Sequence, residues 1–163
     1  MKKVIVIGGG PAGMFAALAA AQNGHSVSLL EKNEKLGKKL YITGKGRCNI
    51  TNAGDVDTLF ENVMTNRKFL YSAFYAYDNQ RVIDFFETHG VRTKIERGNR
   101  VFPYSDHSSD VIAALKRALV NDGVNIHQHT SVKELLVEDQ RCRGAVLEDG
   151  TKEMADAVIL ATG

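Results

Sequence analysis

The chain contains no tryptophan, only two prolines and two cysteines, and no long hydrophobic run. Cys48 and Cys142 form no CxxC pair and stand near no histidine at metal-ligand spacing, which argues against a disulfide framework and a structural zinc site. No stretch approaches the roughly 18 apolar residues of a membrane span. The first apolar run is broken by glycines and a proline before a signal-peptide core accumulates. We therefore expect a soluble, cytoplasmic protein with no metal site and no membrane partner.

A strong excess of either charge is also missing. The 21 Lys and Arg residues nearly balance the 19 Asp and Glu residues, so the net charge is +2. Because nucleic-acid-binding domains usually concentrate a basic excess on one face, we expect no nucleic-acid partner. The chain is 44% hydrophobic, which excludes a disordered chain, and its 163 residues correspond to about one domain.

Short β-branched runs alternate with helical segments along the chain. Val4–Ile7 has the pattern of a strand buried on both faces, and residues 14–22 are typical of a helix. A second strand, Ser26–Leu30, completes a βαβ unit, in which the two strands are parallel and adjacent. The sequence thus predicts an α/β fold around a parallel sheet.

The later segments extend this pattern. We expect a loop over 32–52, then helical stretches between 59 and 86 with their aromatic residues in the core. A strand at 91–95 and a polar loop at 100–107 should lead into a helix at 110–120, capped by Ser108 or Ser109. After a strand at 124–128 we expect an antiparallel β-meander at 131–138, 142–148 and 152–154, and a last parallel strand at 157–161.

The strongest functional signal is Gly8-Gly-Gly-Pro-Ala-Gly13, a GxGxxG motif between a predicted strand and a predicted helix. Gly8 allows the tight turn, Gly10 lets the backbone approach a pyrophosphate, and Gly13 permits close packing of helix on strand. Glu31, at the end of the second strand, is placed to accept hydrogen bonds from ribose hydroxyls and to repel a 2′-phosphate. The motif therefore predicts binding of FAD or NAD rather than NADP, with Lys32 beside Glu31 in the site.

Three features resemble the FAD domain of the glutathione-reductase type. Pro11 and Ala12 fill the motif positions that Pro-Ala commonly occupies in flavoproteins. The predicted meander leads into a strand that ends in Ala-Thr-Gly, and in that group this turn lies against the cofactor. The resemblance implies FAD, with Thr162 and Gly163 beside it and the backbone of Val132 at the adenine. An NAD-dependent dehydrogenase without flavin and a non-catalytic dinucleotide-binding module remain as alternatives.

A narrower resemblance rests on Gly37-Lys-Lys-Leu-Tyr-Ile-Thr-Gly-Lys-Gly-Arg-Cys-Asn-Ile-Thr-Asn52, together with Arg100-Val-Phe-Pro103. With these segments the chain resembles the bacterial YhiN/BaiN-like flavoproteins. Membership implies an FAD-dependent oxidoreductase that transfers a hydride between flavin N5 and a small organic substrate. NAD(P)H as a transient reductant is one option for the electron donor. The resemblance does not identify the substrate or the electron donor.

Residues of this block have the chemistry that a flavin cofactor requires. Lys39 and Arg47 can offset pyrophosphate charge, and Gly46 lets backbone N–H groups face an anion. Asn49 and Thr51 supply neutral donors and acceptors for ribityl hydroxyls or the edge of the flavin ring. We predict that these five residues contact the cofactor.

The sequence leaves the catalytic residues open. Cys48 lacks a CxxC partner, so we expect it to pack as a small hydrophobic residue. Tyr104, Asp106 and His107 could donate protons, but a Pro-Tyr-Ser-Asp segment before a helix is ordinarily a turn and a cap.

The strand near the end of the sequence, Val158–Ala161, is strongly apolar. In the family that the chain resembles, the polypeptide continues from here into a substrate domain and a returning sheet strand. We therefore expect residues 1–163 to be the N-terminal, FAD-binding portion of an enzyme, inactive alone. Its exposed strand would be covered by the rest of the same polypeptide or by a second chain.

Overall fold

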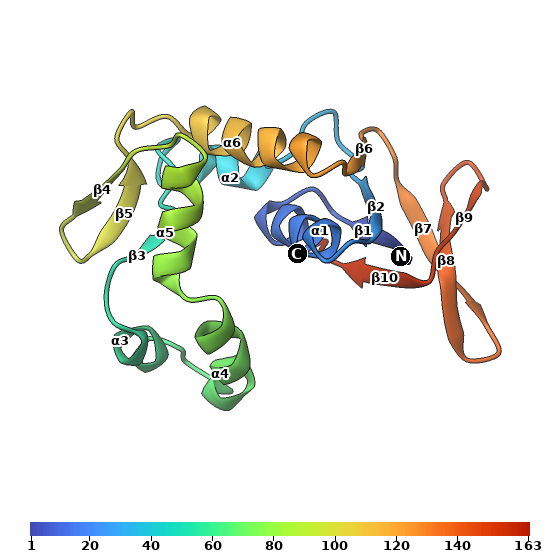
Figure 1. Cartoon of the computed structure of the whole chain (residues 1–163), viewed down its shortest axis with the longest axis horizontal. Coiled ribbons are helices and arrows are strands. Elements are labelled where there is room, and N and C mark those ends of the chain that lie inside the picture. Colours follow the sequence, from blue (N-terminus) through green and yellow to red (C-terminus); the bar gives the residue numbers. More distant parts are fainter. The chain divides into compact units, whose positions relative to one another are not determined.

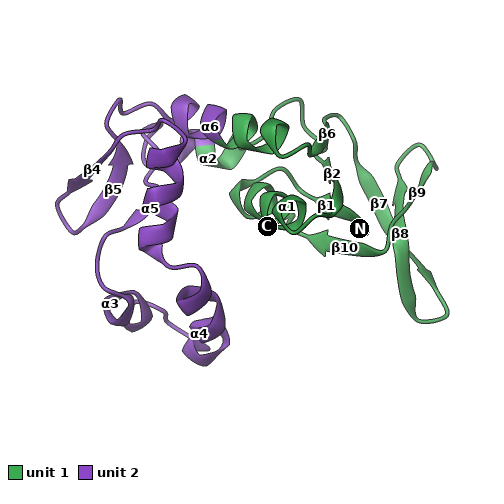
Figure 2. Cartoon of the chain, in the orientation of Figure 1, with its two compact units in different colours: residues 1–40, 115–163 green, residues 41–114 purple.

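The computed structural model describes all 163 residues, and Figure 1 shows the order of the helices and strands. The chain divides into two compact units (Figure 2). Unit 1 comprises residues 1–40 and 115–163, and unit 2 comprises residues 41–114. No helix has the length and apolar character needed to span a membrane.

Unit 1 is built on a four-stranded parallel sheet with the strand order β10-β1-β2-β6. Its strands are β1 (Lys3–Ile7), β2 (Ser26–Leu30), β6 (Asn125–His127) and β10 (Ala157–Leu160), and α1 (Pro11–Gln22) joins β1 to β2. Val6 lies opposite Leu29 on one side and Ile159 on the other. Val6, Leu29 and Met14 of α1 are fully buried. The predicted parallel α/β fold is confirmed.

An antiparallel sheet completes unit 1. It consists of β7 (Val132–Glu138), β8 (Arg141–Leu147) and β9 (Lys152–Met154), in that spatial order. Ala145 of β8 is buried with Ile5, Ile7 and Leu30, and Val132 packs against the same cluster. The predicted meander is therefore confirmed, and it is fixed to the parallel sheet through apolar contacts.

Unit 2 contains a second antiparallel sheet and a set of short helices. The strands β3 (Thr51–Asn52), β5 (Arg100–Pro103) and β4 (Thr93–Glu96) pair in that order. The helices are α3 (Val56–Glu61), α4 (Arg67–Ala76) and α5 (Asn79–Thr88). Asp55 and Asp78 cap α3 and α5 by accepting hydrogen bonds from backbone N–H groups of their first turns. Two further helices, α2 (Lys38–Ile42) and α6 (Ser108–Asn121), have residues in both units.

Two segments that were predicted to be loops contain regular structure. Residues 100–103 form β5, because Val101 and Phe102 are buried and the strand pairs with both β3 and β4. Residues 32–52 include the single-turn α2 and the short β3. Polar and glycine-rich composition hid these elements. The partner of β3 is the distant β5, whereas β5 also pairs with the neighbouring β4. Helix α6 begins at Ser108, whose hydroxyl donates to the Tyr41 carbonyl at 2.8 Å.

The prediction that the aromatic residues between 69 and 86 form core was wrong for α4. Phe86 of α5 is buried, but α4 has no buried residue, and its Phe69 and Tyr75 are 84% and 65% exposed. The rings of Phe74 and Tyr75 contact Phe60 of α3, which takes the only buried aromatic position between these two helices. Helical spacing indicates a helix but does not tell which of its faces is covered.

Candidate dinucleotide-binding site

The glycine motif forms the tight connection between β1 and α1. Gly8 has φ +111°, and its N–H donates to the Leu30 carbonyl at 2.8 Å. A Cβ added at Gly8 would collide with the Ala161 carbonyl oxygen, and one added at Gly13 would collide with the Gly8 carbonyl oxygen. The turn and packing roles predicted for Gly8 and Gly13 are therefore confirmed.

Gly10 has a different environment from these two glycines. It is the N-cap of α1, with φ −74° and ψ 177°, and an added Cβ would have no atom within 4 Å. Pro11 occupies the first turn of α1, and Pro11 and Ala12 are both exposed. No side chain caps this helix and its first turn has no acidic residue. The positive end of the helix dipole is thus open to an anion, which fits a pyrophosphate.

Glu31 follows β2 and is only 8% exposed. Its Oε2 accepts a hydrogen bond from Gly9 N–H at 2.7 Å, and its Oε1 accepts from the backbone N–H and the side-chain amide of Asn33 at 2.8 and 2.5 Å. A carboxylate offers about four acceptor positions. Three are used within the protein, so the group is held in place and retains capacity for a ligand hydroxyl.

Asn33 is a site residue that sequence reasoning missed. Its backbone carbonyl accepts a hydrogen bond from His129 N–H at 3.1 Å, and its Oδ1 accepts from Lys38 Nζ at 3.4 Å. The segment is further fixed by Gly37 N–H, which donates to the Gly9 carbonyl at 2.9 Å. The available signal was general: an asparagine two residues beyond an acidic residue commonly forms local hydrogen bonds.

The other predicted residues of unit 1 lie as follows. Ala161 N–H donates to the Ile7 carbonyl at 2.8 Å, which places the exposed Thr162 and Gly163 beside the end of β1. A Cβ added at Gly163 would lie 3.3 Å from Lys39 Nζ. The exposed Lys32 follows Glu31, and the half-buried Val132 begins β7. The glycine motif, Glu31 and the Ala-Thr-Gly turn thus meet at the carboxyl ends of the parallel strands, where α/β folds bind ligands.

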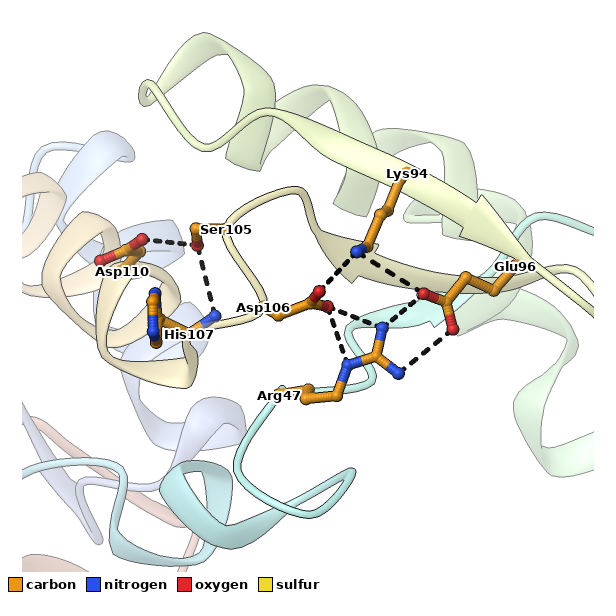
Figure 3. A network of polar contacts seen from close by, with 7 residues as sticks. All are labelled: Arg47, Lys94, Glu96, Ser105, Asp106, His107 and Asp110. Carbon is orange, nitrogen blue, oxygen red and sulfur yellow. Dashed lines mark hydrogen bonds and ion pairs between the residues drawn. The ribbon is translucent and has the colours of Figure 1, made fainter.

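The four remaining predicted residues belong to unit 2. Gly46 has φ +85°, and Asn49 is exposed. Thr51 lies in β3 opposite Val101. The guanidinium of Arg47 donates to the carboxylates of Glu96 and Asp106 (Figure 3). Contact of these four residues with the cofactor stays a prediction.

Ionisation states in unit 2 bear on the candidate proton donors. Hydrogen bonds from Lys94 and then Arg47 lower the pKa of Asp106, and the hydrogen bond from Arg47 lowers the pKa of Glu96. Both carboxyls are therefore ionised at neutral pH and hold no proton to donate. Cys48 has no exposed surface, and desolvation raises the pKa of its thiol to about 11. The expectation that Cys48 packs as a small apolar residue is confirmed.

Comparison with known proteins places this site in a family. The model of the HI0933-like protein Rossmann domain matches residues 2–163. The chain is 33% identical over 166 aligned positions to the 3-dehydro-bile acid delta(4,6)-reductase of Clostridium scindens. The alignment covers 100% of this chain and 39% of that protein. The chain is 26% identical over 161 positions to the ribosomal RNA dihydrouridine synthase of Haemophilus influenzae, covering 98% and 39%.

A solved structure supports the same fold. The Mycobacterium smegmatis Sdh1 complex in the apo form superposes with a TM-score of 0.76 at 21% identity, covering 99% of this chain and 34% of that one. The chain thus spans about two fifths of the length of the two relatives. Membership of this family supports FAD as the cofactor of the Rossmann domain. The chain belongs to the HI0933-like Rossmann domain family.

Proposed function

We propose that this chain is the FAD-binding domain of a flavin-dependent oxidoreductase, and that it holds the adenosine half of the cofactor. The observation that carries the proposal is the hydrogen bond between Gly9 N–H and Glu31 Oε2 at 2.7 Å. It ties the glycine motif to the only buried acidic residue of the unit. A pyrophosphate group at the start of α1 and a ribose at Glu31 are neighbouring parts of one dinucleotide.

The residues of unit 1 have distinct tasks in this proposal. The open backbone at Gly10 and the N-terminus of α1 bind the pyrophosphate, and Lys39 offsets its charge. Glu31 accepts a hydrogen bond from a ribose hydroxyl, while Asn33 holds the carboxylate in place. When bound, FAD supplies an isoalloxazine ring that can accept or donate a hydride at N5. The chain's own part is to bind and orient the cofactor.

The reaction of the whole protein is a broader proposal. One relative is named for a bile acid and the other for ribosomal RNA, two substrates of different chemical classes. Because both match the same Rossmann domain, this domain does not specify the substrate. We propose a two-electron transfer to or from a small organic molecule, with NAD(P)H as a transient reductant. The two free cysteines fit a reducing, cytoplasmic location.

Further contacts complete the proposal for the whole protein. Leu160 is 62% exposed on β10, which lies at the edge of the parallel sheet. An exposed apolar sheet edge is a surface that proteins usually cover. We propose that another part of a longer polypeptide, or a second chain, packs on β10.

The test is retention of flavin by the purified chain. After incubation with FAD and gel filtration, the protein should show the two absorption bands of oxidised flavin, near roughly 370 and 450 nm. Glu31→Ala should weaken FAD affinity at least about tenfold, because a hydrogen bond to a charged group contributes about 1.5–3 kcal/mol. Quenching of flavin fluorescence measures the affinity.

Glu34→Ala is the matched control, because the exposed Glu34 carboxylate forms an ion pair with Lys38, at 3.3 Å, and no hydrogen bond to the glycine motif. It should bind FAD as the wild type does. Circular dichroism of each variant checks that it is folded. Retention of NAD(H) in place of flavin would favour the nicotinamide alternative. Equal FAD affinity of the wild type and Glu31→Ala would show that the ribose does not bind Glu31.

A further inference from the structure

The loop Gly44–Cys48 has an unusual backbone. Gly44, Lys45, Gly46 and Cys48 have φ values of +63°, +60°, +85° and +61°. L-residues other than glycine disfavour this left-handed region, so the conformation at Lys45 and Cys48 needs support from the surroundings. Part of that support is local: Cys48 N–H donates to the Thr43 carbonyl at 2.9 Å.

One long-range support is the Ser108 N–H, which donates to the Gly46 carbonyl at 3.1 Å. Arg47 provides the side-chain support (Figure 3). Its Nε donates to Asp106 Oδ1 at 2.8 Å, its Nη1 donates to Glu96 Oε2 at 3.3 Å, and its Nη2 contacts both carboxylates. The guanidinium also lies 4.3 Å from the centroid of the Phe102 ring. Paired carboxylates and an aromatic face match the planar fork of an arginine and fix its position.

Lys94 completes a closed set of charges. Its Nζ lies 2.6 Å from Asp106 Oδ2 and 3.6 Å from Glu96 Oε1. Two cations therefore face two carboxylates, and all four side chains are about 28–42% exposed. Because both carboxylates already compensate the charge of Arg47, little of that charge is left for a phosphate.

We propose that Arg47, Lys94, Glu96 and Asp106 form a clamp that holds the Gly44–Cys48 loop in its left-handed conformation. Arg47 is then a positioning residue, which acts through the loop backbone and not as a ligand of the cofactor. Lys94 and Glu96 stand on β4, and Asp106 precedes α6. The clamp thus fixes the loop to the antiparallel sheet of unit 2. Its effect on FAD rests on the proposed function, but its effect on the loop does not.

Hydrogen exchange tests the clamp without any cofactor. In Arg47→Ala, amides of residues 43–49 should exchange about tenfold faster or more than in the wild type, because the loop loses its anchor. Amides of β1 and α1 should keep their rates. Arg100→Ala is the matched control: Arg100 also lies near the Phe102 ring, at 5.8 Å, but its Nε donates to the Arg97 carbonyl. Equal loop protection in the wild type and Arg47→Ala would overturn the clamp.

FAD affinity separates a clamp from a phosphate ligand. The double variant Glu96→Gln/Asp106→Asn keeps Arg47 but removes its partners. A clamp predicts a loss of about five- to tenfold, similar to Arg47→Ala, with no further loss in the triple variant, because the residues act as a unit. Arg47→Lys should bind FAD as weakly as Arg47→Ala, since lysine lacks the planar fork of arginine. A phosphate ligand predicts equal or tighter binding once Arg47 is released, and this result would overturn the inference.

The two proposals fail in different ways. A wild-type chain that retains no FAD would overturn the proposed function. Hydrogen exchange would then be the test of the clamp. A wild-type chain that binds FAD, with a double variant that binds as well or better, would keep the function and reject Arg47 as a positioning residue.

Discussion

Cys48 combines a buried thiol with a left-handed backbone, and both properties limit its reactivity. The thiolate is the reactive form of cysteine. Because desolvation raises the pKa of Cys48 to about 11, from an ordinary value of 9.0, the group stays protonated well above neutral pH. Because the pKa is higher in the folded state than in the unfolded state, the contribution of this thiol to the free energy of unfolding is fully present below pH 9. It is lost as the pH rises towards 11.

Thiol labelling should therefore distinguish the two cysteines. With a disulfide reagent between about pH 7 and 9, the half-buried Cys142 should react first, and Cys48 should react only after unfolding. Cys142→Ser should remove the fast-reacting thiol, and Cys48→Ser should leave it. Both variants are followed by absorbance of the released reagent. Labelling of native Cys48 at the rate of Cys142 would contradict the burial of its thiol.

Residue chemistry was predictable where the partners are local. The spacing of Gly8, Gly13 and Glu31 reflects backbone sterics within one βαβ unit, so the sequence alone locates these residues. The partners of Arg47 lie 49 and 59 residues further along the chain, and no local pattern shows that Glu96 and Asp106 meet there. A basic residue in a glycine-rich loop therefore predicts a phosphate ligand until its carboxylate partners are known.

At the scale of elements, pairing between strands decides what local patterns leave open. The strands of the parallel sheet were predicted because burial on both faces makes them continuous apolar runs. Strand β5 was missed, since only pairing with β3 and β4 turns Arg100–Pro103 into a strand. The exposed aromatic residues of α4 show the converse: its sequence predicted the helix but not its degree of burial.

Alanine substitution should lower the stability of the protein at Gly13 but not at Gly10. Gly13→Ala places a Cβ against the Gly8 carbonyl and 3.3 Å from Ala161 Cβ, so it should lower the free energy of unfolding by about 1–3 kcal/mol. Gly10→Ala enters open space at an allowed φ, so stability should stay within about 0.5 kcal/mol of the wild type. Urea unfolding followed by circular dichroism measures both.

Gly10→Ala should affect FAD affinity although it leaves stability unchanged. If the pyrophosphate approaches the backbone at this position, the added methyl group occupies its space and Gly10→Ala should weaken FAD binding although the protein is intact. FMN, which lacks the adenosine and the pyrophosphate, should not report this change. Unaltered FAD affinity in Gly10→Ala would place the pyrophosphate elsewhere.

At the scale of the whole molecule, the distribution of aromatic residues determines how binding can be observed. The chain has no tryptophan, and all five tyrosines lie between residues 41 and 114, in unit 2. Tyrosine fluorescence therefore reports on unit 2 alone. Far-ultraviolet circular dichroism also detects α1 and the parallel sheet, which carry the proposed adenosine site, and is the appropriate measurement for the effect of FAD on unit 1.

FAD should raise the thermal midpoint of the chain. A ligand present at a hundred times its Kd stabilises the native state by about 2.7 kcal/mol, which for a chain of this size corresponds to about 5–10 °C. FMN at the same concentration should raise the midpoint little, because FMN lacks the adenosine ribose that we propose binds Glu31. In Glu31→Ala the increase with FAD should shrink towards that with FMN. Equal increases with FAD and FMN in the wild type would mean that stabilisation comes from the flavin half, and the adenosine site at the carboxyl ends of β1 and β2 would have to be given up.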